Sequence, residues 1–200
     1  QDFSGGPTGC LGLKLLECLD KTYCSIACYS DRLAEDDDFT ARFRAATQVW
    51  HVTMNFSDEE LANQVRRDEI DVLVDLSGHV GRRLFVFARR PAPLQLTWLG
   101  YVGTTGLTAM DGLVADRFHV RPGEEPWYSE TVLRMPHDYI CFGARAASPA
   151  VAPLPALATG RVTFGSFNNP AKYSQSTLDA WSSILLRVPA SRLLLKYNGL

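Results

Sequence analysis

The stretch that decides the fold is Val72-Leu-Val-Asp-Leu76, a nearly continuous apolar run that leads into Ser77-Gly-His79. Runs of this kind are typical of parallel strands covered on both faces, because strands of antiparallel sheets usually alternate apolar and polar residues. A capping box at Ser57-Asp-Glu-Glu60 predicts that a helix begins there, and this helix precedes the strand. A second helix is expected after it, at 82–89, so the run lies within a β-α-β series.

Working outward, the same alternation of strand and helix continues in both directions. The other elements that we expect in this part of the chain are helices at 11–19 and Asp36–Ala46, and strands at Tyr23–Tyr29, Val49–Val52, Leu94–Leu99 and Gly112–Ala115. This order predicts an α/β fold with a doubly wound, Rossmann-like parallel sheet. Ligands of such sheets bind at the carboxyl ends of the strands. The turns that this rule selects are Ser4–Thr8, Leu76–Gly81, Gly100–Gly106 and Phe167–Lys172.

The composition changes between Ala144 and Gly160, where Ala and Pro dominate and charge almost disappears. We therefore predict a first domain over 1–145, a linker over 146–160, and the start of a second Rossmann-like domain over 161–200. The chain begins with what reads as the end of a strand and ends on a strand, so we expect a fragment that lacks its first strand and is truncated in the second domain.

Composition and charge narrow the class of protein. Apolar residues make up 46% of the chain and the formal net charge is −2, so we expect a globular protein without general attraction to nucleic acid or membrane surfaces. No apolar run reaches 18 residues and no signal peptide opens the chain. The five cysteines show no metal-binding spacing and lie in apolar surroundings, which predicts buried free thiols in a reducing compartment, the cytoplasm.

Three kinds of residue are suited to chemistry. Gly100–Gly106 follows a strand directly, and its glycines and hydroxyls permit close approach of a ligand, although a plain tight turn fits equally well. Lys172, before a helix that begins near Ser174, suits a diphosphate, although a solvated surface lysine is the usual case. His51 and His79 lie near strand ends, where a base or a sugar-binding group is expected, although a lone histidine is more often structural.

The order of these segments resembles the catalytic region of the protein O-linked N-acetylglucosamine transferases and the related SPINDLY-type O-fucosyltransferases. The resemblance is carried, over essentially the whole chain, by Asp2-Phe3, Ile70–His79, Ala88–Gln95, Trp98–Gly106, Met110-Asp111, Val162–Asn169 and Lys172. It implies a GT-B glycosyltransferase with two Rossmann-like domains and the active site in their cleft. It further implies inversion at the sugar, no catalytic metal or other cofactor, Ser/Thr of proteins as acceptors, and possible tetratricopeptide repeats upstream. Such proteins are expected in the cytoplasm, or also in the nucleus of a eukaryote.

The resemblance also assigns residues at the donor and sugar sites. It implies that Lys172 contacts the donor diphosphate and that Asn169 contacts the nucleotide. It implies that Leu99, Gly100 and Val102 line the site near the sugar, with Val102 in place of the family's usual proline.

Further assignments concern the first domain. The resemblance matches His51 with an active-site histidine, which we expect to be catalytic, and Arg90 with the arginine of an Arg-Pro-Ala-Pro string. We expect Arg90, His79 and Thr104 to contribute to substrate binding. One departure is that Gly6 stands where the family usually has a histidine, and glycine can neither accept a proton nor hydrogen-bond a sugar through a side chain.

The sequence leaves three functional hypotheses. The first is transfer of N-acetylglucosamine from UDP-N-acetylglucosamine, or of fucose from GDP-fucose, to proteins. The second is a catalytically silent family member that binds proteins or nucleotides as a scaffold, which the substitution at Gly6 favours. The third, a Rossmann-type dehydrogenase, ranks low because no GxGxxG follows a first strand.

Overall fold

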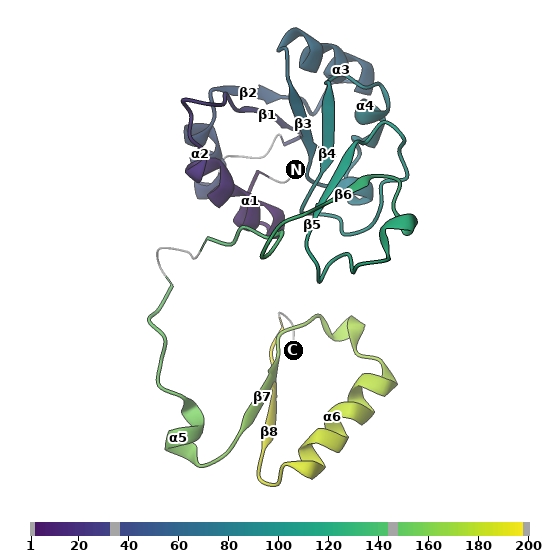
Figure 1. Ribbon diagram of the computed structural model, residues 1–200. Helices are drawn as coiled ribbons and strands as arrows, with labels where there is room; N and C mark the ends of the chain where they lie inside the picture. The colour runs from purple at the N-terminus through teal and green to yellow at the C-terminus, as the bar shows by residue number, and fades with distance from the viewer. Residues whose placement is uncertain (1–2, 33–36, 144–147, 198–200) are drawn as a thin grey trace. The chain divides into compact units, whose positions relative to one another are not determined.

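A computed structural model describes residues 3–32, 37–143 and 148–197, and the chain divides into two compact units, Gln1–Arg145 and Ala146–Leu200. The first unit holds α1 Pro7–Cys18, β1 Ala27–Ser30, α2 Asp38–Ala46, β2 Val49–Val52, α3 Asp58–Arg67, β3 Val72–Asp75, η1 Gly78–Val80, α4 Leu84–Ala88, β4 Leu94–Thr97, β5 Gly112–Ala115, η2 Glu125–Trp127 and β6 Thr131–Arg134 (Figure 1). The second holds α5 Pro155–Thr159, β7 Thr163–Ser166, η3 Pro170–Lys172, α6 Gln175–Arg187 and β8 Arg192–Leu195.

All strand pairs recorded in the first unit are parallel, as the sequence predicts. The strands form two ladders, one of β1 and β2 and one in the order β3-β4-β5-β6, rather than the single sheet that we expected. In a right-handed series the strand that leads into α1 would lie between β1 and β3. The described residues before α1, 3–6, contain no strand, so no backbone hydrogen bonds within that part of the chain join the two ladders.

The main core lies on one face of the larger sheet, under α3 and α4. Its buried members are Leu61, Ala62, Val65, Leu73, Val86, Phe87, Ala92 and Met110. The expectation that β3 is covered on both faces is wrong for this chain: Leu73 and Asp75 are buried, but Val72 and Val74 are 46% and 40% exposed. The helices α3 and α4 cover only the face that carries Leu73, so the opposite side of the strand stays open.

Several element boundaries differ from the sequence-based expectations. The strand predicted to begin at Tyr23 begins at Ala27, because a turn over 21–23 leaves the Tyr23 side chain 89% exposed. The predicted linker contains α5, which Pro155 starts and Gly160 ends in the left-handed conformation. We did not predict β6. The helix expected to begin near Ser174 and the strand expected at the end of the chain are present as α6 and β8.

The cysteines are free thiols in the structure, but only Cys28 is buried. The prediction that they pack in the core is wrong for Cys18, which is exposed on the last turn of α1 because it faces away from the buried side of that helix, Gly9, Gly12 and Leu13. Among the residues that the structure describes, no helix is long and apolar enough to cross a membrane.

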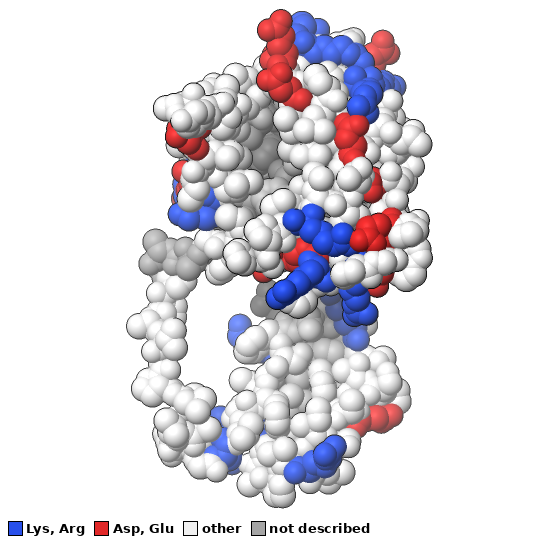
Figure 2. All heavy atoms as spheres, viewed as in Figure 1, with Lys and Arg blue, Asp and Glu red and all other residues white. Residues whose placement is uncertain are grey.

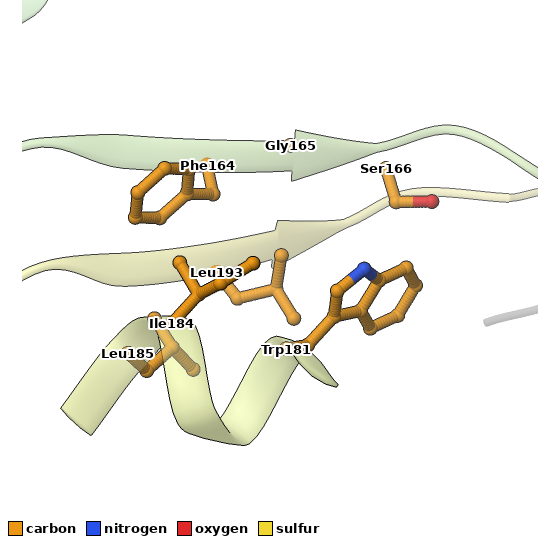
Figure 3. Close-up of a pocket in the computed structure, with 7 residues that line it drawn as sticks. All are labelled: Phe164, Gly165, Ser166, Trp181, Ile184, Leu185 and Leu193. Carbon is orange, nitrogen blue, oxygen red and sulfur yellow. The ribbon is translucent and has the colours of Figure 1, made fainter. Parts of the chain in front are cut away.

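The second unit is a β-α-β motif in which β7 and β8 pair in parallel. None of its described residues, 148–197, is fully buried. Its apolar side chains leave a cavity of about 180 Å³ between the two strands and α6 (Figure 3). The residues that line it are Phe164, Gly165, Ser166, Trp181, Ile184, Leu185 and Leu193. This cavity is the apolar side of the motif and holds none of the residues predicted to bind substrate.

Candidate functional site

The turns at the carboxyl ends of β3 and β4 are in direct contact. A Cβ built on Gly100 would lie 2.0 Å from the backbone oxygen of Leu76 and 3.3 Å from Oγ1 of Thr8, so only glycine fits there. Three of the turns selected from the sequence, those at Ser4–Thr8, Leu76–Gly81 and Gly100–Gly106, therefore meet at one place. This is the edge of the sheet at which ligands of parallel α/β folds bind.

The backbone of the turn after β4 is unusual where it leaves the strand. Leu99 has a φ of 81°, which is sterically unfavourable for a residue with a side chain. It is also buried, and its Cδ2 lies 3.5 Å from the Cβ position of Gly12 on α1. Gly78 has a positive φ of 52°, and an added Cβ would lie 2.4 Å from the Cβ of Tyr101. Strained backbone such as that of Leu99 persists only where surrounding structure fixes it, which often occurs at binding sites.

His79 and Thr104, both expected to bind substrate, are brought together. The Nε2 atom of His79 lies 3.2 Å from the carbonyl oxygen of Thr104, and the imidazole packs edge-on against Tyr101. A neutral histidine that donates to this carbonyl has its proton on Nε2. His79 therefore links the turn after β3 to the turn after β4.

A buried carboxylate that the sequence did not reveal holds the same turn. Oε2 of Glu130 accepts a hydrogen bond of 2.7 Å from the Thr104 hydroxyl, and Oε1 accepts one of 2.7 Å from the Thr105 amide. The Thr105 hydroxyl also donates to Oε1. Burial opposes ionisation of Glu130, but the hydrogen bonds from Thr105 and Thr104 outweigh it and place the pKa of the carboxyl below its ordinary value.

His119, to which we assigned no role from the sequence, contacts this turn from another side. Its Nε2 atom lies 2.5 Å from the carbonyl oxygen of Val102, and its ring packs 4.6 Å from that of Tyr139. Asp116 fixes the backbone around it by accepting from the amides of Phe118, His119 and Tyr139. These hydrogen bonds, with that of His119 the largest contribution, lower the pKa of Asp116.

Asp75, at the end of β3, joins two strands and the following turn. Its side chain is buried and accepts from the amides of Ser77 and Gly78 and from the hydroxyl of Thr97 on β4. The apolar run recognised in the sequence thus ends in a polar anchor for the turn that carries His79.

The turn before α1 is also held by an aspartate, but among the described residues no atom packs closely against Gly6. Asp37 accepts from the amides of Gly5 and Thr40, and these hydrogen bonds lower the pKa of Asp37 to about 2. Gly6 is the N-cap of α1, makes no side-chain cap and has an ordinary extended backbone with φ −72°. The nearest atom to a Cβ built there is 3.9 Å away, on Ser4, so the glycine meets no steric demand.

His51 lies on β2, and its recorded partners are Asp68 and Tyr29. Its Nε2 atom is 2.9 Å from Oδ2 of Asp68, and its ring stacks on Tyr29 at a centroid distance of 5.4 Å. The Tyr29 hydroxyl donates to the same Asp68 oxygen at 2.7 Å. Among the contacts recorded for the described residues, none joins His51 to the turn after β4.

Arg90 is at the opposite end of β4. Its guanidinium donates to the carbonyl oxygens of Ala109 and Pro93 and to the carboxylate of Asp111, all before the strands β4 and β5 begin. The hydrogen bond from Arg90 lowers the pKa of Asp111. Arg90 therefore links the segments at the amino ends of the strands, and the structure does not bring it to the turns at their carboxyl ends.

In the second unit, Asn169 and Lys172 lie on the turn after β7. Oδ1 of Asn169 accepts from the Ala171 amide at 3.0 Å and starts the short helix η3. Lys172 is exposed at the end of η3, just before Ser174 caps α6 by accepting from the Thr177 amide. A cation beside the amino end of a helix is suited to bind a phosphate group.

The charged residues and the possible metal ligands say less about the position of the site than the turns do. Acidic and basic side chains both occur on the face of the first unit shown in Figure 2. On α3 the acidic residues Asp58, Glu59 and Glu60 lie in the first turn and the basic residues Arg66 and Arg67 in the last. Within the described ranges, no group of three or more His, Cys, Asp or Glu side chains could hold a metal ion.

With this geometry in place, comparison with known proteins decides the family. Residues 1–148 match the family model described as glycosyl transferase family 41. The chain belongs to glycosyl transferase family 41. The match includes every first-unit turn described above.

Individual relatives of this family 41 chain agree. It is 37% identical over 182 residues to a barley (Hordeum vulgare) protein named probable UDP-N-acetylglucosamine–peptide N-acetylglucosaminyltransferase SPINDLY, covering 88% of this chain and 19% of the relative. The Arabidopsis thaliana protein of the same name is 38% identical, covering 88% and 20%. The chain thus spans about a fifth of the length of these curated relatives.

A solved structure supports the fold. A mutant O-GlcNAc transferase of Thermobaculum terrenum matches with a TM-score of 0.90 and 39% identity, covering 99% of this chain and 37% of that one. The predicted family and the predicted GT-B-type α/β fold are confirmed by these matches.

Proposed function

We propose that the protein transfers a single sugar from a nucleotide sugar to Ser or Thr hydroxyls of proteins. The observation that carries this proposal is the convergence of three turns at Gly100, within a chain that belongs to glycosyl transferase family 41. The names of the relatives favour UDP-N-acetylglucosamine as the donor, and GDP-fucose is the other donor that the sequence suggests.

The chemistry proposed is a direct displacement with inversion. The acceptor oxygen forms a bond to the anomeric carbon while the bond from that carbon to the diphosphate oxygen breaks. The diphosphate leaves with the electron pair, and the acceptor proton passes to a base. Stabilisation of charge on the leaving group is commonly the largest single contribution to such a rate, and the Lys172 ammonium with the first amides of α6 would supply it.

The first unit would bind the sugar and the acceptor. Leu99, Gly100 and Val102 offer a fixed backbone surface, to which Thr104 and His79 add polar groups. His51 is the candidate for the base, and the carboxylate of Asp68 lies 2.9 Å from its Nε2 atom. Asn169 would contact the nucleotide. Arg90 is better suited to hold the strand ends than to contact substrate.

The remaining parts of the proposal rest on the family resemblance. We infer that transfer needs no metal ion or other cofactor, that tetratricopeptide repeats select the protein acceptors, and that the protein acts in the cytoplasm, or in the nucleus if the organism is a eukaryote. Transfer measured before and after treatment with EDTA tests the first point, and unchanged turnover is the expected result.

The decisive experiment offers the full-length protein radiolabelled UDP-N-acetylglucosamine and GDP-fucose in parallel, with a pool of Ser/Thr-rich peptides. Label should appear on peptide from one donor. Peptides with Ser and Thr replaced by Ala are the control, and label on them would contradict the proposed acceptor. Release of free sugar without label on any peptide would indicate hydrolysis instead.

A second candidate is a catalytically silent scaffold. Its support is Gly6, which leaves the amino end of α1 without a side chain where the family usually has a histidine. Calorimetry with both donors, run beside the transfer assay, separates the two functions, because both candidates would bind a donor but the scaffold would transfer no sugar.

A further inference from the structure

The turn over residues 103–106 is held by a side chain far away in the sequence. Glu130 precedes β6 and lies 25 and 26 residues after the threonines that it contacts. Only 4% of its surface is exposed, and the same holds for Thr105. A buried carboxylate is costly unless hydrogen bonds satisfy it, so its position is dictated by those bonds.

Each hydrogen bond to Glu130 fixes a different part of the turn. The amide of Thr105 sets the path of the backbone, and the two hydroxyls set the rotamers of Thr104 and Thr105. These hydroxyls in turn accept from backbone amides, Thr104 from Gly106 and Thr105 from Leu107. Loss of the carboxylate would therefore release the whole segment rather than a single side chain.

The turn transmits this constraint to the predicted substrate site. The imidazole of His79 contacts the carbonyl oxygen of Thr104. Its orientation therefore depends on the backbone that Glu130 fixes. The Val102 carbonyl at the other side of the turn is held separately, by His119. Glu130 and His119 thus hold the two halves of one turn, and of these two side chains Glu130 is the one that contacts Thr104, whose hydroxyl is also hydrogen-bonded by Ser129.

We propose that Glu130 is a positioning residue of the glycosyltransfer site, which holds the turn 103–106 and, through the Thr104 carbonyl, His79 in the conformation that binds substrate. This inference rests on the proposed function. Misplacement of binding groups by about 1 Å can reduce rates by about 100-fold, so a side chain that touches no substrate can still govern binding.

The test compares Glu130→Ala, Glu130→Gln and the control Glu59→Ala in the full-length protein. Glu59 is an exposed carboxylate on α3. Kinetics with the donor that the unsubstituted protein uses should show a KM raised about ten-fold or more in Glu130→Ala, exceeding any fall in kcat. Glu130→Gln should recover most of this loss, because its amide oxygen can still accept from both groups of Thr105.

A merely structural role would give a different pattern. Partial unfolding of Glu130→Ala would lower the active fraction, and so the apparent kcat, with KM unchanged. That result, or wild-type KM in a folded Glu130→Ala protein, would overturn the proposal.

Hydrogen–deuterium exchange separates this inference from the proposed function. Exchange should rise in Glu130→Ala at the amides of 104–107 and 77–81 and stay unchanged in the second unit. If the unsubstituted protein transfers no sugar, the proposed function fails and the role in substrate binding with it, while exchange still decides whether Glu130 sets the turn. Exchange equal to that of the unsubstituted protein would refute the positioning role even if the enzyme is active.

Discussion

The turn after β4 and the turn after β7 both carry residues assigned to substrate binding, but they are built differently. The turn after β4 is fixed by side chains from distant parts of the chain, namely His79, His119 and Glu130. The turn after β7 is fixed locally, by the Asn169 side chain and by Tyr173, whose hydroxyl donates to the Asn168 carbonyl. Substitutions in the turn after β4 should therefore change the conformation of the turn. Substitutions in the turn after β7 should remove only the function of the substituted side chain.

The largest effect is expected at Lys172. Lys172→Ala should lower kcat about 100- to 1,000-fold in the full-length protein, because the leaving diphosphate would lose its cation. The melting temperature should not change, since the side chain is exposed and the turn is held by Asn169. Steady-state kinetics and calorimetric melting check the two halves of this prediction.

Arg187→Ala is the control, because Arg187 is an exposed cation in the last turn of α6, at the end of that helix away from the turn after β7. It should leave turnover unchanged. Equal turnover in Lys172→Ala and the unsubstituted protein would show that Lys172 takes no part in the mechanism. It would also contradict the proposed difference between the two turns.

The next effect is structural and concerns the turn after β4. Gly100→Ala should destabilise the first unit by about 1 to 3 kcal/mol, because the new methyl group would overlap the Leu76 carbonyl oxygen and force the two turns apart. Urea unfolding measures the change. Gly6→Ala is the control and should change stability by no more than about 0.5 kcal/mol, since no atom is close to the added Cβ. Similar losses in both variants would show that the turns do not meet at Gly100.

These contrasts also show what the sequence could reveal. The strands Val49–Val52 and Gly112–Ala115, the capping box of α3 and the start of α6 near Ser174 could be predicted because their signals are local. The strand β6 could not, since its residues are largely exposed and show no apolar run.

The candidate site divides in the same way. The rule that ligands bind at the carboxyl ends of strands was enough to select the turns that meet at Gly100. Glu130 and His119 could not be found, because their hydrogen bonds span 25 and 17 residues and no local pattern encodes such a contact. For Arg90, the motif indicated substrate binding, whereas the partners Ala109, Pro93 and Asp111 place it at the other end of the strand.

A smaller effect should appear in acid, at the turn before α1. The folded pKa of Asp37 is about 2, below its ordinary value near 3.8, so its ionised form stabilises the fold. This contribution is complete above about pH 4 and is lost as the pH falls through the interval towards 2. Asp37→Asn keeps one acceptor for Thr40 but turns an amino group towards the Gly5 amide, so its urea midpoint should be lower at pH 7 and fall less on acidification.

Asp38→Asn controls for the loss of charge, because Asp38 is exposed on the first turn of the same helix. Its urea midpoint should follow that of the unsubstituted protein between pH 7 and pH 3. If Asp37→Asn also does so, the hydrogen bond from Gly5 does not hold the first turn.

The smallest structural effect is expected at Gly6, where the family resemblance implies a histidine. Gly6→His should leave stability within about 0.5 kcal/mol of the unsubstituted protein, because the backbone is extended and the position is open. If the protein is an active transferase, its site works without this side chain, and turnover in Gly6→His should stay within about ten-fold. A silent protein that gains turnover with the histidine would show that the three turns are correctly arranged and lack only that group, because a general base alone typically contributes about 100- to 10,000-fold. Kinetics of Gly6→His therefore distinguishes a site that is active without this histidine from a site that is inactive because it lacks it.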